Sequence, residues 1–493
     1  MFMKEKYDLI IVGMGPSSIF CVYELLKNNC KKKILMIEKG HPIEKRICPI
    51  KGTGRCKKCK PICNIIGGFS GAGAFSDGKL LSYHLSSYNE STNDIYIGGK
   101  DDTFIKEYYT SNEIKKYMKY TDDIYLSFGA SDKLEGIERK EEIFKLQKKA
   151  EESNIKLIDV PVRHLGTEKS HELYKKLEDY IRDKVDMLFE TEVDDLIIED
   201  NTIVGVRTNA KNIYSNKVIL AVGVDGASWL EKLCNKYNIN YRNGYMDIGI
   251  RYELSDKTMS YVNELLYEGK FISNVEPYND KVRTYCQNPS GFVTPETYDN
   301  GFTLVNGHSY KNKKSNNTNL AILVSEKFDS PFDSPIKYGF NIAEKANLLS
   351  GGKPIVQRLG DLLNHESTTL DRINDNKVIP TMTCGYYGDL SYVLDYRTLT
   401  DIINFIKQMN NIIPGFMDDD NLLYGPEIKF YGKELILNKE FETSIKNLYS
   451  IGTGGGLTIG LMNASLSGVM MAHNLLKNDE GGILWKNVYQ KIL

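Results

Sequence analysis

The chain has 493 residues, with 63 Lys and Arg against 65 Asp and Glu, a formal net charge of -2, and 41% hydrophobic residues. This length and apolar content are sufficient for more than one domain. The balanced charge excludes the strong overall positive field that attracts nucleic acid backbones and anionic membranes. We therefore expect neither a nucleic acid nor a membrane as partner.

The first residues carry no pattern for export. After Met1–Lys6 the chain enters a short apolar run, without the long apolar segment and small-residue cleavage site of a secretory signal. The longest apolar runs, such as 218–222, have the length of strands and fall far short of the roughly 20 residues of a membrane span. We expect a soluble, cytoplasmic protein.

The first elements predicted along the chain form a βαβ unit. Residues 7–13, YDLIIVG, predict a buried parallel strand, residues 19–26 an apolar helix, and residues 34–38, ILMIE, a second buried strand. The segment from Tyr7 to Glu38 has the normal size of such a unit.

The turn of this unit has the pattern of a dinucleotide-binding site. Gly13 permits a tight strand-to-helix turn, Gly15 lets the backbone approach a pyrophosphate, and Ser18 is small enough for close helix packing. The N-terminus of the helix offers free N–H groups to an anion. Glu38, at the end of the second strand, is placed to accept hydrogen bonds from ribose hydroxyls. The sequence therefore predicts a bound dinucleotide.

Farther along the chain, the patterns predict a series of further elements. In chain order they are an extended loop over 49–78, mainly helices over 104–177, a hairpin over 187–208 around the turn Glu199–Asn201, a buried strand over 217–223, an inserted mixed domain over 241–436, a strand with a glycine turn over 447–452, and a helix over 461–476.

Two of these segments resemble FAD-binding flavoproteins of the glutathione-reductase-like superfamily. KVILAVG, residues 217–223, is similar to their strand that ends in a small-small-Gly turn, and the stretch LYSIGTGGGLTIGLMNASLSGVMMA is similar to their C-terminal flavin motif. Nearly the whole chain also resembles one family of FAD-dependent dehydrogenases. The stretches that carry this second resemblance are RICP, GGFSGAGAFSDGKL, PVRHLGT, AVGVDGASWL, DIGIRYE, RTYCQNPSGFV, NGHSY and YGPEIKFY.

The resemblance implies an α/β fold, with a Rossmann-like FAD-binding domain, an inserted helical segment and a mixed α+β substrate domain. The expected boundaries are 1–98 for the first part of the FAD-binding domain, 99–152 for the helical insertion, 153–235 for the second part, 236–440 for the substrate or cap domain, and 441–493 for the third part.

The fingerprint and the resemblance together imply a set of FAD-binding residues drawn from all three parts of that domain. They are Gly13, Gly15, Pro16, Ser17, Ser18, Glu38, Lys39, Arg46, Gly71, Ala72, Gly73, Phe75, Ser76, Asp77, Gly78, Lys79, Val193, Ala221, Gly223, Gly452, Thr453, Gly460, Leu461 and Met462.

The final motif departs from the flavoprotein pattern at two positions. Most such proteins have an acidic residue where this chain has Thr453, and relatives in the dehydrogenase family tend to have an Arg where this chain has Ile459. A Thr hydroxyl donates or accepts one hydrogen bond, so we expect weaker FAD retention rather than its loss.

Four of the nine cysteines, Cys48, Cys56, Cys59 and Cys63, lie in one short loop. Four thiolates with one Cys-x-x-Cys pair satisfy the ligand count of an iron–sulfur cluster or of tetrahedral zinc. A dithiol that exchanges electrons with the flavin and a set of inert thiols are the other two interpretations. The loop directly precedes the glycine segment 67–80, so we expect it near the flavin.

Candidates for substrate chemistry are polar residues in the motif-like stretches of the substrate side. Arg251 would bind a carboxylate or phosphate, Tyr285, His308 and His164 would move a proton coupled to hydride transfer, and Cys286 is a further candidate. Arg163 and Arg283 are similar candidates for anion binding. Each of these residues has an ordinary structural role as its alternative.

The sequence thus predicts an FAD-dependent oxidoreductase that moves electrons between a small organic substrate and a donor or acceptor. A nicotinamide or a ferredoxin-like protein is the expected electron partner, and only one dinucleotide fingerprint is visible. Two other functions stay open, a flavin-dependent RNA-modifying enzyme and a non-catalytic FAD-binding redox sensor. Near-neutral charge argues against the first of them.

Overall fold

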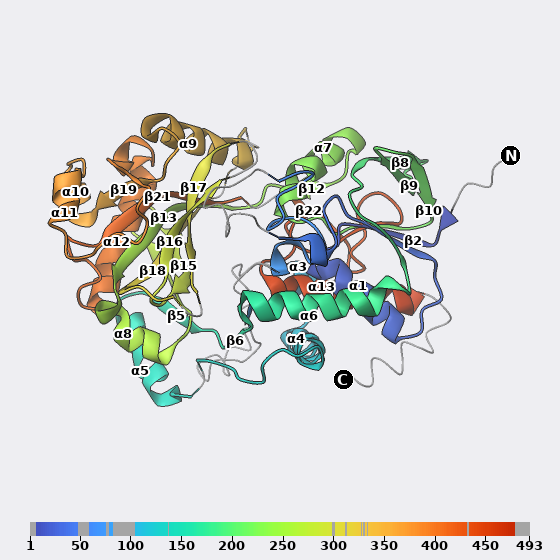
Figure 1. The fold of residues 1–493 in the computed structure, drawn as a ribbon, viewed down its shortest axis with the longest axis horizontal. Coiled ribbons are helices and arrows are strands. Elements are labelled where there is room, and N and C mark those ends of the chain that lie inside the picture. Colours follow the sequence, from blue (N-terminus) through green and yellow to red (C-terminus); the bar gives the residue numbers. More distant parts are fainter. Residues whose placement is uncertain are drawn as a thin grey trace.

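The chain folds into two lobes, each with its own sheet and its own apolar core (Figure 1). The computed structural model describes residues 6–47, 59–74, 78–81, 104–136, 138–297, 301–310, 313–326, 328, 331–332, 334–430 and 433–478. The N-terminal strands and the last helix both belong to the first lobe, on the right in Figure 1.

The first lobe is built on a parallel sheet of five strands, in the order β23-β11-β2-β3-β7. Its strands are β2 (Leu9–Val12), β3 (Ile34–Ile37), β7 (Asp186–Leu188), β11 (Val218–Leu220) and β23 (Leu448–Ser450). Every residue of β2 and β3 is buried, as expected of strands with both faces covered. The sheet therefore joins segments from the beginning, the middle and the end of the chain.

Two helices pack against each other on this sheet, α1 (Pro16–Lys27) and α13 (Leu461–Asn478). They approach closely because residue 468 is a glycine: a Cβ at Gly468 would lie 2.0 Å from the carbonyl oxygen of Ser17. The other helices of the lobe are α3 (Phe104–Tyr108), α4 (Ser111–Ser127), α6 (Gly166–Arg182) and α7 (Ala227–Tyr237). The helix predicted over 19–26 starts earlier in the structure, at Pro16, because proline is favoured at the first position of a helix.

The predicted hairpin is confirmed for β8 (Val193–Glu199) and β9 (Thr202–Thr208), which pair in antiparallel fashion, whereas residues 187–188 at its predicted start belong to β7 of the parallel sheet. Asp200 and Asn201 form its two-residue turn with φ angles of 45° and 57°, the left-handed conformation that such turns require. Strands β10 (Asn212–Ser215) and β1 (Lys6–Tyr7) extend this small sheet.

The second lobe is built on a sheet of eight strands, in the order β20-β19-β21-β13-β18-β15-β14-β5. The strands are β5 (Lys156–Asp159), β13 (Met246–Ser255), β14 (Gly269–Val275), β15 (Asp280–Asn288), β18 (Asn317–Glu326), β19 (Ile355–Arg358), β20 (Tyr386–Tyr387) and β21 (Leu422–Lys429). A separate hairpin of β16 (Phe292–Thr297) and β17 (Thr303–His308) packs against its central strands.

Helices cover one face of this sheet, on its outer side in Figure 1. They are α5 (Lys140–Glu152), α8 (Asp256–Leu265), α9 (Pro335–Ser350) and α12 (Tyr396–Ile412). Alternate residues of the strands, such as Ile248, Phe271 and Ile322, join the apolar core beneath these helices. The residues between them point to the opposite face, as the period of a strand requires.

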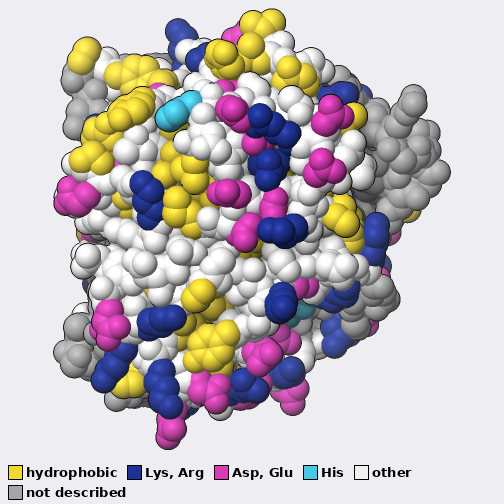
Figure 2. Space-filling view, turned by 90° about the vertical axis from the view of Figure 1, so that its left-hand side faces the viewer, with side chains coloured by type: hydrophobic (Ala, Val, Ile, Leu, Met, Phe, Trp, Pro, Cys, Tyr) yellow, Lys and Arg dark blue, Asp and Glu magenta, His cyan; other side chains and the backbone are white. Residues whose placement is uncertain are grey.

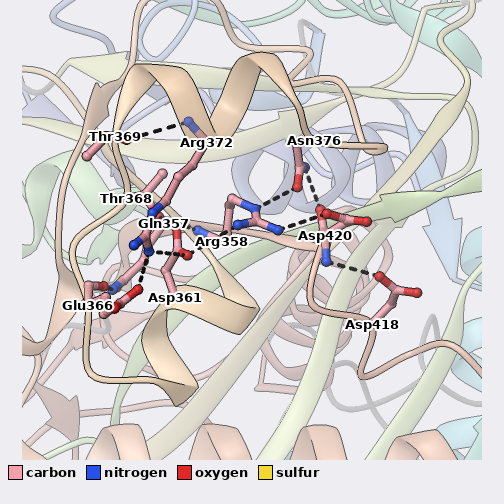
Figure 3. Close-up of polar contacts among 10 residues, drawn as sticks. All are labelled: Gln357, Arg358, Asp361, Glu366, Thr368, Thr369, Arg372, Asn376, Asp418 and Asp420. Atoms are coloured by element: carbon pink, nitrogen blue, oxygen red, sulfur yellow. Dashed lines mark hydrogen bonds and ion pairs between the residues drawn. The ribbon is translucent and has the colours of Figure 1, made fainter.

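A network of charged residues holds the outer corner of the second lobe, at α10 (Leu359–Leu363) and α11 (Leu370–Asn374). Figure 3 shows Arg358 at its centre, with Nη2 2.9 Å from Asp420 Oδ1 and Nε 2.7 Å from Asn376 Oδ1. Arg372 donates to Asp361 from the next helix, at 2.7 Å. On the face of the molecule drawn in Figure 2, which is the left-hand side of Figure 1, acidic and basic side chains are interspersed.

The structure divides the predicted helical insertion, 99–152, between the two lobes. Helix α4 packs on α13 in the first lobe, whereas Ile143, Leu146 and Ala150 of α5 belong to the core of the second lobe. Strand β5, which we expected in the FAD-binding domain, is an edge strand of the second sheet. Two strands, β4 (Lys79–Leu81) and β6 (Val162–His164), pair with each other. No described helix has the length and apolar character needed to cross a bilayer.

Candidate functional site

A cavity of about 630 Å³ opens at the carboxyl ends of β2, β3 and β11 in the first lobe. This volume falls within the range of about 300–1,000 Å³ that is usual for cofactor and ligand sites. The position is the one at which open α/β sheets bind their ligands.

Glycines shape the wall of the cavity next to β2. Gly13 has a φ angle of +97°, and a Cβ there would lie 2.6 Å from the carbonyl oxygen of Ala221. A Cβ at Gly15, in contrast, would meet nothing within 4 Å. Gly13 therefore permits the turn, while Gly15 leaves open space for a ligand beside the backbone.

Two helix N-termini face the same cavity. Helix α1 begins after Gly15 and has no side-chain cap, and Gly460 and Leu461 at the start of α13 line the cavity. The N–H groups of a first helical turn have no partners within the helix, and the helix dipole places partial positive charge there. This arrangement suits a ligand that carries negative charge at two separate places.

Glu38 lines the cavity at the end of β3, where the fingerprint predicts it. Its Oε2 accepts a hydrogen bond from the N–H of Met14 at 2.9 Å, and its Oε1 accepts from Gly40 and Gly68 at 2.9 and 3.1 Å. Because an ionised carboxylate has about four acceptor positions, these bonds leave capacity for a ligand hydroxyl. The three N–H donors also fix the side chain in one orientation.

The cavity brings together most of the residues that we predicted for FAD binding. Those on its wall are Gly13, Gly15, Pro16, Ser17, Glu38, Lys39, Gly71, Ala72, Gly73, Val193, Ala221, Gly223, Thr453, Gly460 and Leu461. They come from all three sequence segments that build the lobe. Lys39 forms an ion pair with Asp225, which also lines the cavity.

Other predicted residues lie behind the wall. Ser18 is buried and donates to the carbonyl oxygen of Gly15 at 3.0 Å, and Met462 is packed in the core. Gly452 lies against Ser17, since a Cβ there would be 2.7 Å from Ser17 Oγ. These three residues support the wall rather than form it.

Arg46 does not line the cavity, contrary to our prediction. Its guanidinium donates to the carbonyl oxygens of Asn64, Ile65 and Phe69, at 3.0, 2.9 and 2.5 Å. Burial lowers the pKa of Arg46 to about 10. The physical reason for the difference is that a loop rich in glycine has few partners of its own, and Arg46 supplies donors to its carbonyl groups.

Sequence reasoning missed several residues of the wall that follow β11, chiefly Trp229 and Lys232. The Trp229 side chain is fixed by a hydrogen bond from Nε1 to the carbonyl oxygen of Asp194, at 3.0 Å. A signal was present, because Trp229 belongs to a motif-like stretch directly after the buried strand.

The cysteine loop is described only in part. Cys48 and Cys56, together with the predicted flavin residues Phe75, Ser76 and Asp77, lie outside the described residues. Cys59 and Cys63 are half-buried, and Ile62 and Ile66 on either side of Cys63 line the cavity. Among the described residues, no three His, Cys, Asp or Glu side chains form a group that could hold a metal ion.

A second group of polar residues lies on the face of the eight-stranded sheet that the helices leave uncovered. We call it the polar face. Its residues are Asp247 and Arg251 on β13, Lys270 on β14, Arg283 and Tyr285 on β15, Ser325 on β18, and Glu427 and Lys429 on β21. Their neighbours along each strand belong to the core under the helices.

Arg251 is fully buried in the polar face and does not offer its guanidinium to a ligand, contrary to our prediction. Its Nε and Nη2 donate to both oxygens of Glu427, at 2.8 and 2.7 Å, and Nη1 donates to the carbonyl oxygen of Cys286 at 2.9 Å. Burial, the largest single effect, disfavours the charged guanidinium, but Glu427 and Cys286 together outweigh it, so the pKa of Arg251 is raised. Arg251 is therefore a positioning residue for β15 and β21.

Two predicted residues from the first half of the chain meet the second lobe at one place. His164 is paired with Lys79 between β6 and β4, and its Nε2 lies 3.3 Å from the hydroxyl of Tyr267. Lys79 Nζ donates to the carbonyl oxygen of Gln287 at 3.2 Å and lies 3.6 Å from Glu268 Oε2. Lys79 and Gly78, which we predicted as FAD contacts, lie outside the wall of the cavity.

Lys270 lies near Lys79 and Glu268 and was not predicted as a site residue. Its side chain is only 2% exposed. Burial lowers the pKa of Lys270 to about 8; the charge of Glu268 opposes this effect, and the positive charges of Arg283 and Lys79 add to it. A buried lysine with a lowered pKa is typical of functional sites.

Tyr285 and Cys286 lie next to Lys270 at an irregular point of β15. The pairing of β15 with β18 shifts register between Tyr285 and Asn288, and Cys286 has a φ angle of 50°. The guanidinium carbon of Arg283 lies 5.3 Å from the centre of the Tyr285 ring. Burial, and next the charge of Cys286, raise the pKa of Tyr285, so its hydroxyl stays protonated and able to donate a hydrogen bond.

His308 lies at the end of β17, apart from these residues, and contacts Tyr310 edge to face with ring centres 4.5 Å apart. Its neighbour Gly307 is close to Arg251, because a Cβ on Gly307 would lie 2.7 Å from Arg251 Nη1. The structure thus brings together His164, Tyr285 and Cys286 with Lys79 and Lys270, whereas it places His308 in the adjoining hairpin.

Comparison with known proteins supports the assignment of the cofactor. Residues 256–429 match the family model described as "FAD-dependent protein, C-terminal domain-like", which spans the second lobe from α8 to β21. This match over the second lobe agrees with the predicted FAD-dependent protein. The narrower prediction of a glutathione-reductase-like flavoprotein stays a prediction.

One sequence relative and several solved structures align with most of the chain. An uncharacterized protein of Clostridium beijerinckii is 25% identical over 498 aligned positions, which cover 95% of this chain and 80% of that protein. Among solved structures, L-proline dehydrogenase from P. horikoshii aligns with 12% identity, 99% coverage of both chains and a TM-score of 0.39. Glycine oxidase from Bacillus cereus aligns with 13% identity, 97% coverage of both chains and a TM-score of 0.35.

Proposed function

We propose that this FAD-dependent protein, with the C-terminal domain match over residues 256–429, is an oxidoreductase that acts on a small organic substrate. FAD bound in the glycine-lined cavity would supply the electron transfer. The substrate would lie between that cavity and the polar face of the second lobe. The observation that carries the proposal is the cavity itself, with Gly15, Glu38 and two helix N-termini on one wall.

The residues of the cavity fit FAD by their chemistry. Gly15 leaves open space next to the uncapped N-terminus of α1, as a pyrophosphate requires. Glu38 keeps an acceptor position for a ribose hydroxyl, and the N-terminus of α13 provides partial positive charge for the flavin ring. Thr453 lines the cavity with its single hydroxyl in place of the usual acidic residue.

The second lobe would contribute the groups that hold the substrate and move its proton. His164 and Tyr267 are in contact and belong to different lobes, so they lie where a substrate bound between the lobes would meet them. The proton acceptor or donor would be one of these two groups or Tyr285. Glu268 and Lys270 beside this place are buried, whereas His164, Tyr267 and Tyr285 are half-buried and within reach of a substrate.

The electron partner and the role of the cysteine loop are further parts of this proposal. A nicotinamide or a ferredoxin-like protein would exchange electrons with the flavin. Cys59 and Cys63 adjoin residues that line the cavity, which favours either a dithiol in exchange with the flavin or ligands of an iron–sulfur cluster or zinc. Iron, zinc and sulfide analysis of anaerobically purified protein, with a Cys59→Ser variant, distinguishes these roles.

A substitution at Gly15 tests the cofactor site. Gly15→Val would fill the open space beside α1, so we expect bound FAD to fall at least tenfold, measured as flavin released per mole of purified protein. Ala210→Val adds side-chain volume in an exposed turn and should leave the FAD content unchanged. Full FAD content in Gly15→Val would contradict the proposed site.

Flavin reduction tests the oxidoreductase activity. Under anaerobic conditions, we expect the flavin absorbance of the wild-type protein to bleach with NADH, NADPH or reduced ferredoxin, or with a substrate from a panel of small acids, alcohols and amines. A protein that holds FAD but is reduced only by dithionite would contradict the proposed function and favour a non-catalytic FAD-binding role.

A further inference from the structure

Three buried hydroxyl groups form a hydrogen-bonded chain behind the wall of the cavity. The Tyr174 hydroxyl lies 3.0 Å from that of Tyr125, which lies 2.7 Å from Ser465 Oγ. Ser465 Oγ donates to the carbonyl oxygen of Leu461, one turn earlier on α13, at 2.9 Å. The three side chains are fully buried and come from α6, α4 and α13. We call these three groups the hydroxyl chain.

Both ends of the hydroxyl chain reach residues that line the cavity. Leu461, whose carbonyl oxygen accepts the last hydrogen bond, is the first residue of α13 and lines the cavity. At the other end, a Cβ on Gly73 would lie 3.3 Å from the Tyr174 hydroxyl oxygen and 2.8 Å from Leu461 Cδ2. Gly73 lines the cavity too. The chain therefore lies directly behind the part of the wall that Gly73 and the N-terminus of α13 form.

The hydrogen bonds of the chain run in one direction. Ser465 has a single hydroxyl hydrogen, which its bond to Leu461 uses, so Ser465 Oγ accepts the hydrogen of Tyr125. Tyr125 in turn accepts the hydrogen of Tyr174. Burial raises the pKa of Tyr125 to about 12 and raises that of Tyr174 well above its ordinary value, so both hydroxyls keep these hydrogens at neutral pH. Each bond polarises the next, so the two tyrosines strengthen the bond from Ser465 to Leu461.

Packing alone does not account for these hydroxyls. Replacing both partners of a buried hydrogen bond with apolar groups of the same shape can be nearly neutral for stability, and Phe has the shape of Tyr. A satisfied network of buried hydroxyls instead fixes one arrangement of the groups that take part. Here that group is the first turn of α13, because a serine that bonds to the carbonyl four residues back often bends a helix at that point. The chain thus sets the direction of the N–H groups at this helix end.

We propose that the hydroxyl chain holds the N-terminus of α13 against the bound cofactor and thereby raises the reduction potential of its flavin, with Tyr125 as the central positioning residue. The inference rests on the proposed function and adds how the protein tunes the bound flavin. Uptake of two electrons and one proton leaves a flavin ring with one negative charge, which the partial positive charge of a helix N-terminus stabilises. The N–H groups of α13 therefore favour the reduced form over the oxidised form.

The test measures the reduction potential and the FAD affinity of the full-length protein. Anaerobic reduction of the FAD-loaded protein by dithionite, with a reference dye, gives the potential, and titration of the apoprotein gives the dissociation constant of oxidised FAD. We expect Tyr125→Phe to weaken the binding of reduced FAD about tenfold more than that of oxidised FAD. This difference corresponds to a potential about 30 mV lower for a two-electron couple. Tyr174→Phe keeps the bond from Tyr125 to Ser465, so it should lower the potential by less.

Tyr252→Phe is the matched control. The Tyr252 hydroxyl is also fully buried and donates to the carbonyl oxygen of Phe416 at 2.7 Å, but it lies in the core of the second lobe. This variant should lose stability without a change in the reduction potential or in the affinity for FAD.

A double variant tests whether the hydroxyls act as one chain. Ser465→Ala removes the bond to Leu461, so it should lower the potential about as much as Tyr125→Phe does. The two changes break the same chain, so the double variant should lower the potential no further than either single variant. Two independent hydroxyls would instead give the sum of the two shifts.

Two results would overturn the inference. One is a wild-type potential in both Tyr125→Phe and Ser465→Ala with equal losses of affinity for the two forms of FAD, which is the result that support by packing predicts. The other is a higher potential in these variants. Melting temperatures report whether each variant folds, and Tyr174→Phe is the mildest change that still tests the chain.

Failure of the proposed function is a different result. A flavin that only dithionite reduces contradicts the proposed oxidoreductase, yet its potential is still measured and still tests the hydroxyl chain. A protein that binds no FAD overturns both.

Discussion

Lys270 shows how one residue can lower the stability of the fold that contains it. Its pKa falls from the ordinary value of 10.5 to about 8, mainly because burial disfavours the charged amine. A difference of this size corresponds to about 3 kcal/mol between the two protonation states. At neutral pH the folded protein therefore holds a charge that would be better solvated in the unfolded chain.

We expect Lys270→Met to raise the melting temperature at pH 7 by several degrees. Between pH 8 and 10.5 the unfolded chain keeps the Lys270 proton while the folded protein has released it, so wild-type stability rises with pH over this range. The gain from Lys270→Met should therefore shrink as pH rises from 8 to 10. A lower melting temperature of Lys270→Met than of wild type at pH 7 would contradict this account.

Asp401 is a second residue whose burial conflicts with its charge. It is fully buried on α12, where no N–H donor of the described residues satisfies its carboxylate oxygens and its side chain lies against the Asp280 carboxylate. Burial, together with the nearby Asp280, raises the pKa of Asp401 to about 7. The folded protein thus keeps a proton that the unfolded chain loses at a lower pH.

Asp401→Asn should therefore stabilise the protein most at alkaline pH. For an acid with a raised pKa in the folded state, stability falls as pH rises from about 4 toward 7 and stays low above that value. We expect a melting temperature several degrees above wild type at pH 8 and little change at pH 4. Asp375→Asn, in the exposed turn after α11, is the control and should show no such pH dependence.

At the scale of the elements, the contact between α1 and α13 connects packing with the cofactor site. Gly468 permits this contact, and Ser17, whose carbonyl oxygen it approaches, lines the cavity. A larger side chain at position 468 must separate the two helices and move the N-terminus of α1. Overpacking of this kind costs about 1–3 kcal/mol, more than the gain of about 1 kcal/mol in helix propensity from Gly to Ala.

We expect Gly468→Ala to lower both the melting temperature and the affinity for FAD several-fold, measured by FAD titration of the apoprotein. Gly339→Ala on α9 is the matched control, because its Cβ would meet the side chains of Met246 and Phe430 in the second lobe, away from the cavity. That variant should lose some stability without a change in FAD affinity. Equal FAD affinities of Gly468→Ala and wild type would show that the two helices adjust without moving the cavity wall.

The elements also show what the sequence could predict. The βαβ turn and the hairpin at Asp200 and Asn201 depend on neighbours within a few residues, and both were predicted. Lys270 follows Gly269 at the start of a strand whose pattern is that of a half-exposed strand, so nothing local marks it as buried. Its setting, like the pairing of Arg251 with Glu427, depends on strands far apart in the chain.

At the scale of the whole molecule, Lys79 links the two lobes. Its neighbour Leu80 is packed in the core of the first lobe, whereas its amine contacts Gln287 and Glu268 of the second lobe. The Lys79 side chain is only 12% exposed, so water does not compete freely for these contacts. The contacts therefore restrict the movement of one lobe relative to the other.

Lys79→Met should loosen this link without removing FAD. We expect faster limited proteolysis between the lobes and a broader or split thermal transition, with an unchanged FAD content. Lys175→Met on α6 is the control, since Lys175 pairs only with Asp179 within its own helix among the ion pairs of the described residues. A single sharp transition and wild-type proteolysis in Lys79→Met would contradict the linking role.

The sheet of the first lobe has a consequence for how the protein is made. The outer neighbour of β11 in this sheet is β23, which residues 448–450 form, and α13 begins only at residue 461. During synthesis on the ribosome, the second lobe can fold while β11 still has an open, apolar edge, which is a template for wrong pairing. The edge of β11 therefore stays open until the last part of the chain is made, and the cavity wall that Gly460 and Leu461 form is complete only after α13 has emerged.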